Sequence, residues 1–202
     1  MTELVKFYDE HGWVHLKNQI PTDVISIIRD KGIELRMWVD DKIGQPSQYG
    51  TPVYWQGVGC AGMYDEYLMD FYTSDQMYEL ASSFLKTKDV WIYNDQMVVK
   101  LPNDGLYFDK HTDNIFDRIN TVNLCVILDD FTDENGGTLD VYNTNDDEMI
   151  TVYPTQGDIV AIQGNTWHKS NHNKSQEPRG LYACVYADEV VDFQNYYKRL
   201  LK

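Results

Sequence analysis

His111 and Asp113, in the segment DKHTDN, have the residue types and spacing of a metal site. In an extended chain, residues i and i+2 point to the same face, so one imidazole and one carboxylate could share a metal ion. The pattern has little weight alone, because 5 histidines and 32 acidic residues in 202 positions predict roughly one H-x-[DE] match by accident. The interpretation therefore depends on further ligands elsewhere in the chain.

The polar segment GNTWHKSNHNKSQEPRG, residues 164–180, holds the next candidates. With His168 the chain offers two imidazoles and a carboxylate, the facial triad of non-haem Fe(II) oxygenases, which leaves three coordination positions open. A hairpin from His168 back to Arg179 could place the guanidinium beside the metal, where its planar fork suits a carboxylate. The spacing thus indicates a metal with an anionic co-substrate.

His172 is an alternative to His168 as the distal ligand. The two histidines lie in the same polar segment, and a separation of four residues would put both on one face of a strand. The eleven-residue spacing to Arg179 favours His168. For His11 and His15, which alternate with Trp13 on an expected strand, an ordinary packed or surface role is expected.

The composition is that of a packed globular protein, with 43% apolar and 13% aromatic residues. The formal net charge of −15 would repel phosphate backbones and anionic membranes, so neither nucleic acid nor a membrane is an expected partner. A small-molecule substrate is expected instead. The sequence leaves the oligomeric state open.

The cysteines and the first residues favour a cytoplasmic protein. Cys60, Cys125 and Cys184 are odd in number and form no C-x-x-C pair, which favours a reducing compartment. The segment MTELVKFYDEHGW lacks the basic and then apolar pattern of a secretion signal. No apolar run approaches the length of about 18 residues that a membrane span needs.

The periodicity of apolar residues changes once along the chain. Residues 20–40 and about 64–86 have helical spacing, and a glycine-rich loop over 43–62 separates them. After Lys88 the runs are short and β-rich: VWIYNDQMVVK, INTVNLCVIL, GTLDVY, MITVY, GDIVAIQ, TWHKS and GLYACVYA. Strands at this spacing predict a mainly β protein, a sandwich or barrel, with flanking helices.

The expected organisation is a single domain over 1–202, with 1–88 as helical support and lid loop and 89–188 as the β core. The tail VVDFQNYYKRLLK is expected to close with a helix. Because a loop of some twenty residues is uncommon in a compact domain, 43–62 is interpreted as a lid or pocket wall. Tyr49, Tyr54 and Trp55 are its substrate-contact candidates, whereas Trp38, Trp91 and the tyrosines of LYACVYA are expected in the core.

Four blocks of the chain resemble, in order, the phytanoyl-CoA dioxygenase-like family of Fe(II)- and 2-oxoglutarate-dependent oxygenases. They are FYDEHGWVHLKNQIPTDVI, KLPNDGLYFDKHTDN, TVNLCVILDDFTDENGGTL and GDIVAIQGNTWHKSNHNKSQEPRGLYACVYAD. The resemblance implies a double-stranded β-helix, which is a cupin-like jelly-roll of two sheets, with helices packed on one sheet. It implies Fe(II), 2-oxoglutarate and O2 as cofactor and co-substrates.

The resemblance also assigns roles to individual residues. His111, Asp113 and His168 would be the iron ligands, and Arg179 would bind the distal carboxylate of 2-oxoglutarate. Ser170, in the family's H-x-S pattern, would assist at the same carboxylate. The implied activity is hydroxylation of a small-molecule C–H bond with release of succinate and CO2. Halogenating relatives lack the carboxylate ligand, so the presence of Asp113 favours oxygen transfer.

The chain departs from the family's pattern at two points. After GGTL it reads DVYNTNDDE where many members have a PGSH turn, which predicts an acidic rim and a neutral or cationic substrate. Cys125 stands where the family often has tryptophan, and Asn123, two residues earlier, is a replacement polar contact for the co-substrate. Lys100 and Gln96 are expected to face the same pocket, because a spacing of four preserves the face of a strand.

Two alternative functions remain open at this point. A cupin-like metal-dependent isomerase or hydrolase could use the same three ligands without 2-oxoglutarate. A catalytically inactive binding protein of the same fold is suggested by the altered PGSH region.

Overall fold

The computed structural model describes residues 1–43, 61–103, 105, 107–113 and 119–190. Most of the expected lid loop 43–62, with Tyr49, Tyr54, Trp55 and Cys60, lies outside these residues, as does nearly all of the expected tail helix. The elements in chain order are α1 (Thr2–His11), β1 (Trp13–Leu16), α2 (Thr22–Ile43), η2 (Ala61–Met63), α4 (Glu66–Tyr72), α5 (Asp75–Leu85), β2 (Trp91–Lys100), β3 (Phe108–His111), β4 (Thr121–Ile127), β5 (Leu139–Asn143), β6 (Glu148–Val152), β7 (Ile159–Gln163), β8 (His168–Ser170) and β9 (Arg179–Ala187).

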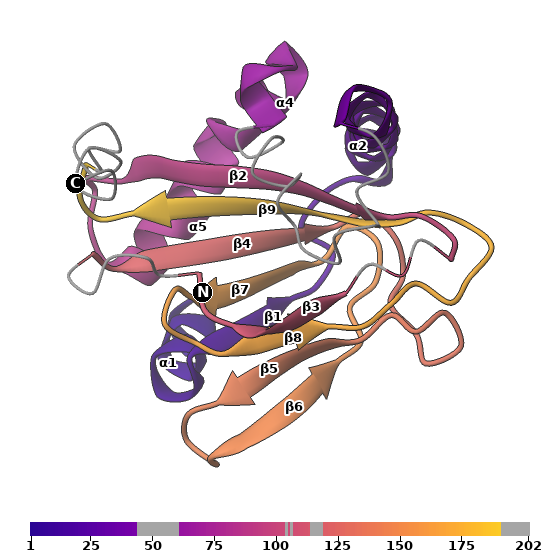
Figure 1. The fold of residues 1–202 in the computed structure, drawn as a ribbon. Helices are drawn as coiled ribbons and strands as arrows, with labels where there is room; N and C mark the ends of the chain where they lie inside the picture. The colour runs from indigo at the N-terminus through magenta and orange to yellow at the C-terminus, as the bar shows by residue number, and fades with distance from the viewer. Residues whose placement is uncertain (44–60, 104, 106, 114–118, 191–202) are drawn as a thin grey trace, which may run out of the picture.

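The described strands form two antiparallel sheets that face each other, which confirms the expected jelly-roll (Figure 1). The five-stranded sheet has the order β1-β7-β4-β9-β2, and the four-stranded sheet has the order β3-β8-β5-β6. Except for β5 and β6, the paired strands are distant in sequence, so the sheets bring the segments around residues 100, 111, 123, 168 and 179 together.

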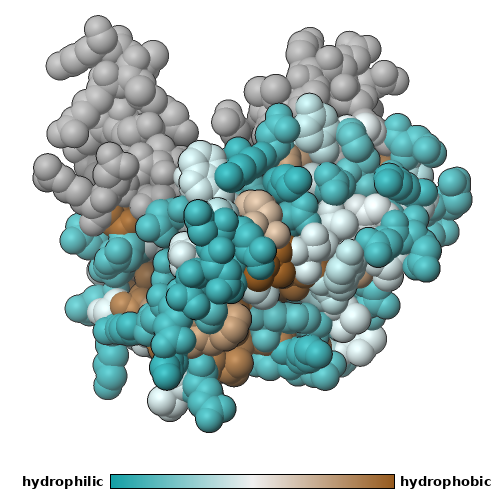
Figure 2. Space-filling view, turned by 90° about the horizontal axis from the view of Figure 1, so that it is seen from below, coloured by the Kyte–Doolittle hydropathy of each residue, from teal (hydrophilic) through white to brown (hydrophobic). Residues whose placement is uncertain are grey.

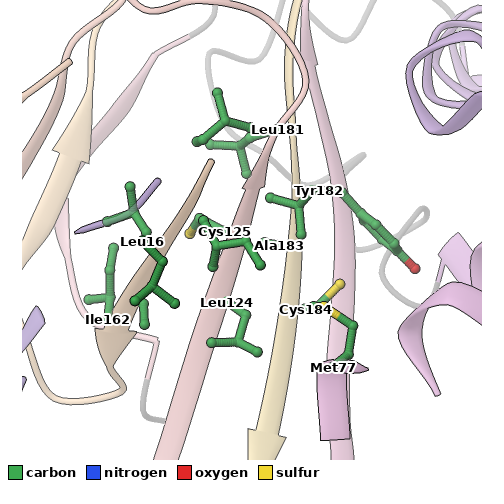
Figure 3. Packing of buried hydrophobic residues seen from close by; sticks show 14 of the residues in the cluster. Leu16, Met77, Leu124, Cys125, Ile162, Leu181, Tyr182, Ala183 and Cys184 are labelled. Atoms are coloured by element: carbon green, nitrogen blue, oxygen red, sulfur yellow. The ribbon is translucent and has the colours of Figure 1, made fainter. Parts of the chain in front are cut away.

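The five-stranded sheet is covered on both faces, and every residue of β4 and β9 is buried. The helices α2 and α5 pack on its outer face, as expected (Figure 1). Alternation along β9 sends Tyr182 and Cys184 toward the helices and Leu181 and Ala183 toward the other sheet (Figure 3). One strand thus contributes to the helix-covered core and to the barrel interior.

The four-stranded sheet is covered on one face only. Seen from below, the molecule presents mostly hydrophilic residues, with hydrophobic ones in the recesses between them (Figure 2). Such one-sided burial is typical of antiparallel sheets. None of the described helices is long and apolar enough to cross a membrane.

The N-terminal half differs from the expectation in several elements. His11 ends a helix, not a strand, because Gly12 with φ of 81° terminates α1 before β1 begins. The helix expected over 64–86 is divided, since the Ser74 side chain accepts a hydrogen bond from Met77 N and starts α5 anew. Trp38 and Trp91 are 45% and 48% exposed, so their expected core positions were wrong, whereas Tyr182 is fully buried as expected.

Asp158 ties the chain around β1 to the start of β7. Its Oδ2 lies 2.7 Å from His15 Nε2 and accepts from Thr155 N at 2.9 Å, and its Oδ1 accepts from Asn18 N at 2.8 Å. Burial raises the pKa of this carboxyl, but the hydrogen bonds from Thr155, Asn18 and His15 more than offset it and hold the pKa below its usual value. The ionised carboxylate therefore stabilises the fold.

We expect Asp158→Asn to lower the free energy of unfolding by roughly 1.5–3 kcal/mol at pH 7, the range for hydrogen bonds to charged groups. Because the folded-state pKa is depressed, the wild-type advantage is complete above the unfolded pKa of about 3.9 and is lost as pH falls through the folded pKa. Urea denaturation from pH 7 downward measures both effects. Equal stability of the two proteins at pH 7 would contradict this interpretation.

Candidate active site

Two imidazoles and one carboxylate lie together where β3 pairs with β8. His111 and His168 oppose each other in the antiparallel register, with ring centroids 4.3 Å apart. Asp113, just after β3, places Oδ1 3.8 Å from His111 Nε2 and Oδ2 3.6 Å from His168 Nε2. One ligand atom of each residue lies within 4.8 Å of the others, so this group is suited to iron.

Backbone carbonyls orient both imidazoles. His111 Nδ1 lies 2.6 Å from Asp109 O, and His168 Nδ1 lies 3.1 Å from Thr166 O. Because a carbonyl only accepts, each Nδ1 carries the hydrogen and each Nε2 presents its lone pair. Burial, and then the neighbouring His168, lower the pKa of His111, which favours the neutral form that binds metals.

The turn before His168 depends on Gly12. Thr166 Oγ1 donates to Gly12 O at 3.0 Å, and a Cβ added at Gly12 would lie only 2.5 Å from that hydroxyl. The φ of 81° at this position is also one that glycine adopts without strain. The residue that ends α1 therefore also makes room for the segment that orients one imidazole.

Asn123 on β4 contacts the carboxylate of the group. Its Nδ2 donates to Asp113 Oδ2 at 2.7 Å, and Cys125 Sγ donates to Asn123 Oδ1 at 3.4 Å. Burial raises the pKa of the Cys125 thiol, so it remains a donor. In this structure the side chain of Asn123, expected at the co-substrate, bonds to Asp113.

A pocket in the barrel interior surrounds the three candidate ligands. Gln96 and Val98 line it from β2, Asn123 and Cys125 from β4, and Leu181 and Ala183 from β9. Each of these pairs is two residues apart on its strand, as the alternation of side chains requires. The pocket also contains Ser170 on β8, two residues after His168.

A second, narrower pocket adjoins the first, and Val98, Ser170 and Leu181 line both. At its end Lys100 and Arg179 are direct partners in the β2–β9 register, and each is 3% exposed. Lys100 Nζ donates to Ser170 Oγ at 2.7 Å and to Asn171 O at 2.6 Å. We call these two adjoining pockets the passage; the first contains the His-Asp-His group and the second contains two cations.

Backbone carbonyls also fix the guanidinium. Arg179 Nη1 donates to Asn135 O at 3.0 Å, Nη2 donates to Asn171 O at 2.9 Å, and Cζ lies 5.1 Å from the centroid of Phe131. Arg179 lines the second pocket, whereas His111, Asp113 and His168 line the first.

Two other sequence-based expectations concern the acidic rim of the pocket after GGTL and His172 as an alternative metal ligand. His172 lies beyond the end of β8, with Nδ1 2.8 Å from Gly105 O, and does not join the His-Asp-His group. The acidic run after GGTL makes local contacts instead of lining the metal pocket: Asp140 contacts Lys169 and Thr151, and Asp146 accepts from Asn143.

The sequence interpretation missed two aromatic residues that shape the passage. Phe108 lines the metal pocket, and its ring centroid lies 5.3 Å from Lys100 Nζ. Phe131 stacks near Arg179 from the loop after β4. Phe108 lies only three residues before His111, which was the available signal, whereas no motif pointed to Phe131.

A family model described as Phytanoyl-CoA dioxygenase (PhyH) matches residues 8–181. No curated protein sequence matches the chain.

Several solved structures are similar over most of the chain. AviO1 from Streptomyces viridochromogenes Tue57 has a TM-score of 0.74 at 19% identity, covering 94% of this chain and 96% of that chain. EvdO2 from Micromonospora carbonacea var. aurantiaca, complexed with 2-oxoglutarate, has a TM-score of 0.70 at 15% identity, covering 95% and 94%. The epimerase SnoN, in complex with Fe3+, alpha ketoglutarate and nogalamycin RO, has a TM-score of 0.74 at 15% identity, covering 92% and 82%. At these identities the likeness shows the fold.

We expect His168→Ala to abolish most metal-dependent stabilisation, whereas His172→Ala, in the same segment, retains it. A ligand that binds only the folded protein stabilises it by about 2.7 kcal/mol when its free concentration is 100 times Kd. Thermal unfolding with and without Mn(II), or Fe(II) under anaerobic conditions, measures this difference. An equal metal-dependent rise in the midpoint for His168→Ala and wild type would exclude His168 as a ligand.

Proposed function

The chain belongs to the phytanoyl-CoA dioxygenase family, and on that premise we propose that it is an Fe(II)- and 2-oxoglutarate-dependent dioxygenase that hydroxylates a C–H bond of a small molecule. One observation carries the proposal. The His-Asp-His group and the Lys100–Arg179 pair lie at the two ends of adjoining pockets that share Ser170.

The donor set fits iron. His111 Nε2, His168 Nε2 and a carboxylate oxygen of Asp113 face one another, and hydrogen bonds at both Nδ1 atoms fix the tautomers that bind metal. When bound, iron with 2-oxoglutarate and O2 supplies the oxidising power, and the 2-oxo acid leaves as succinate and CO2. The chain's residues bind, orient and exclude water.

The far end of the passage fits the distal carboxylate of 2-oxoglutarate. Arg179 is held by two carbonyls, so its planar fork is in place before a carboxylate arrives. Ser170 Oγ accepts a hydrogen bond from Lys100 and can donate its own hydrogen to the same carboxylate. Gln96 lines the metal pocket and is proposed to contact the co-substrate there.

The walls of the passage are suited to excluding water and to positioning the reacting groups. Val98 and Leu181 line both pockets, and Leu139 and Ala183 add apolar surface around the candidate ligands. Apolar walls exclude water from the reacting groups, and strands fixed in two sheets position them more precisely than loops would. These residues therefore limit side reactions while the co-substrate is bound.

The outcome of C–H oxidation depends on the substrate. Asp113 supplies the carboxylate ligand, which supports oxygen transfer, and hydroxylation is the outcome that we propose. The similar structure SnoN is described as an epimerase. The mass of the product distinguishes the two, since hydroxylation adds one oxygen atom and epimerisation leaves the mass unchanged.

We expect Arg179→Ala and Lys100→Met each to weaken 2-oxoglutarate binding by about 10- to 150-fold while metal binding remains. A hydrogen bond to a charged group is worth about 1.5–3 kcal/mol, and each 1.4 kcal/mol is a factor of ten. Anaerobic titration of the Fe(II) protein with 2-oxoglutarate, followed by the visible charge-transfer band, measures the affinity. Asp113→Ala should abolish the band.

Lys110→Met is the matched control, because Lys110 packs over Tyr142 and Trp167 and lines neither of these two pockets. It removes one positive charge and should leave the affinity for 2-oxoglutarate unchanged. A well-folded wild-type protein that gives no visible charge-transfer band with Fe(II) and 2-oxoglutarate would count against the proposed dioxygenase activity. Unchanged affinity in both Arg179→Ala and Lys100→Met would count against the assigned carboxylate site.

A further inference from the structure

We propose that Asn123 and Cys125 are positioning residues that restrict Asp113 to one metal contact, through a single carboxylate oxygen. The inference rests on the proposed function, because it takes His111, Asp113 and His168 as the metal ligands. The two buried β4 side chains would thus act on a metal ligand, and not by contacting the substrate or by filling the core.

The two oxygens of Asp113 have different surroundings. Oδ2 accepts the Nδ2–H of Asn123 at 2.7 Å, which is short for an amide donor and in the range of charge-assisted hydrogen bonds. Oδ1 lies 3.8 Å from His111 Nε2 and Oδ2 lies 3.6 Å from His168 Nε2, so the hydrogen bond from Asn123, and not the distance to an imidazole, distinguishes the two oxygens. The amide thus engages one oxygen and leaves the other for a metal that His111 also binds.

Cys125 supports the orientation in which the NH2 end of the Asn123 amide faces Asp113. Its Sγ–H donates to Asn123 Oδ1 at 3.4 Å, so the amide oxygen is directed to the thiol and the NH2 group to the carboxylate. The reversed amide would place its oxygen against a carboxylate oxygen, which is unfavourable, and would lose the S–H···O hydrogen bond from Cys125. The three side chains therefore form a directed relay, from Cys125 through Asn123 to Asp113.

The relay is rigid because of its place in the sheet. β4 pairs with β7 on one side and β9 on the other, where Asn123 opposes Ile162 and Val185. Asn123 and Cys125 are each 4% exposed. A donor on a central strand, with its rotamer fixed by packing and a second hydrogen bond, holds a ligand in place before the metal binds.

The restriction of Asp113 to one metal contact determines how many coordination positions of the metal stay open. Two imidazoles and one carboxylate oxygen leave three positions of an octahedral metal open. A 2-oxo acid that chelates through two oxygens and a dioxygen molecule need all three. If Oδ2 also bound the metal, one of these positions would be lost.

The test counts water molecules on bound Mn(II), which prefers oxygen and imidazole ligands and needs no turnover. We expect Asn123→Leu, which keeps the size of the side chain but removes the donor, to lower the water-proton relaxivity of each bound Mn(II) by about one third. This is the change from three open positions to two. Asn123→Ala should give the same fall, which keeps the test valid if the leucine variant does not fold.

Cys125 is tested by a matched pair of substitutions. Cys125→Ala frees the amide and should lower the relaxivity by less than Asn123→Leu does, whereas Cys125→Ser keeps a donor and should behave as wild type. Cys184→Ala is the control, because Cys184 lies on the neighbouring strand with its sulfur directed away from that of Cys125 (Figure 3). It removes a buried thiol and should leave the relaxivity unchanged.

The outcomes separate this inference from the proposed function. Wild-type protein that fails to bind Mn(II) would overturn the metal site and with it the proposed function. Wild-type protein that binds Mn(II), together with Asn123 variants of unchanged relaxivity, would overturn only the role of Asn123. Cys125→Ala with wild-type relaxivity would remove the thiol from the relay.

Discussion

The antiparallel pairing of β2, β9 and β4 decides which side chains enter the barrel, because side chains alternate between the two faces of a sheet. In the observed register Lys100 opposes Arg179, and Val98 opposes Leu181, which in turn opposes Ile127. A slip of one residue would turn Lys100 toward the helices and remove a cation from the passage. Such a slip would carry charged side chains such as Lys100 and Arg179 into the helix-covered core, where burying a charge is costly.

The sequence predicted the strands well because their apolar, β-branched runs end in turn residues. It could also predict which residues share a strand face, such as Gln96 with Lys100. It missed α1, although Leu4, Phe7 and Tyr8 recur there at helical spacing, because the helix is short and the strand that follows it directly was extended back to His11. It also missed the break before α5, where one serine side chain outweighs a continuous helical pattern.

Within the site, spacing and family resemblance pointed to the residues but not to their contacts. The ordered His111, Asp113 and His168 come together in the structure, and Arg179 lies beyond them in the adjoining pocket. The contact of Asn123 with Asp113 depends on how the bend after β3 approaches β4, which no local pattern encodes. The carbonyl of Asn135 that holds Arg179 is a backbone group, so side-chain motifs carry no signal for it.

The His-Asp-His group belongs to β3, β8 and the bend after β3 in the four-stranded sheet, whereas the Lys100–Arg179 pair belongs to β2 and β9 in the five-stranded sheet. The separation of the two groups is therefore set by how the two sheets face each other. Lys100 Nζ donates to Ser170 Oγ, so a hydrogen bond already joins the two sheets at the end where the two cations lie. A dicarboxylate that reached both groups would therefore bridge the two sheets, and binding it would link them a second time.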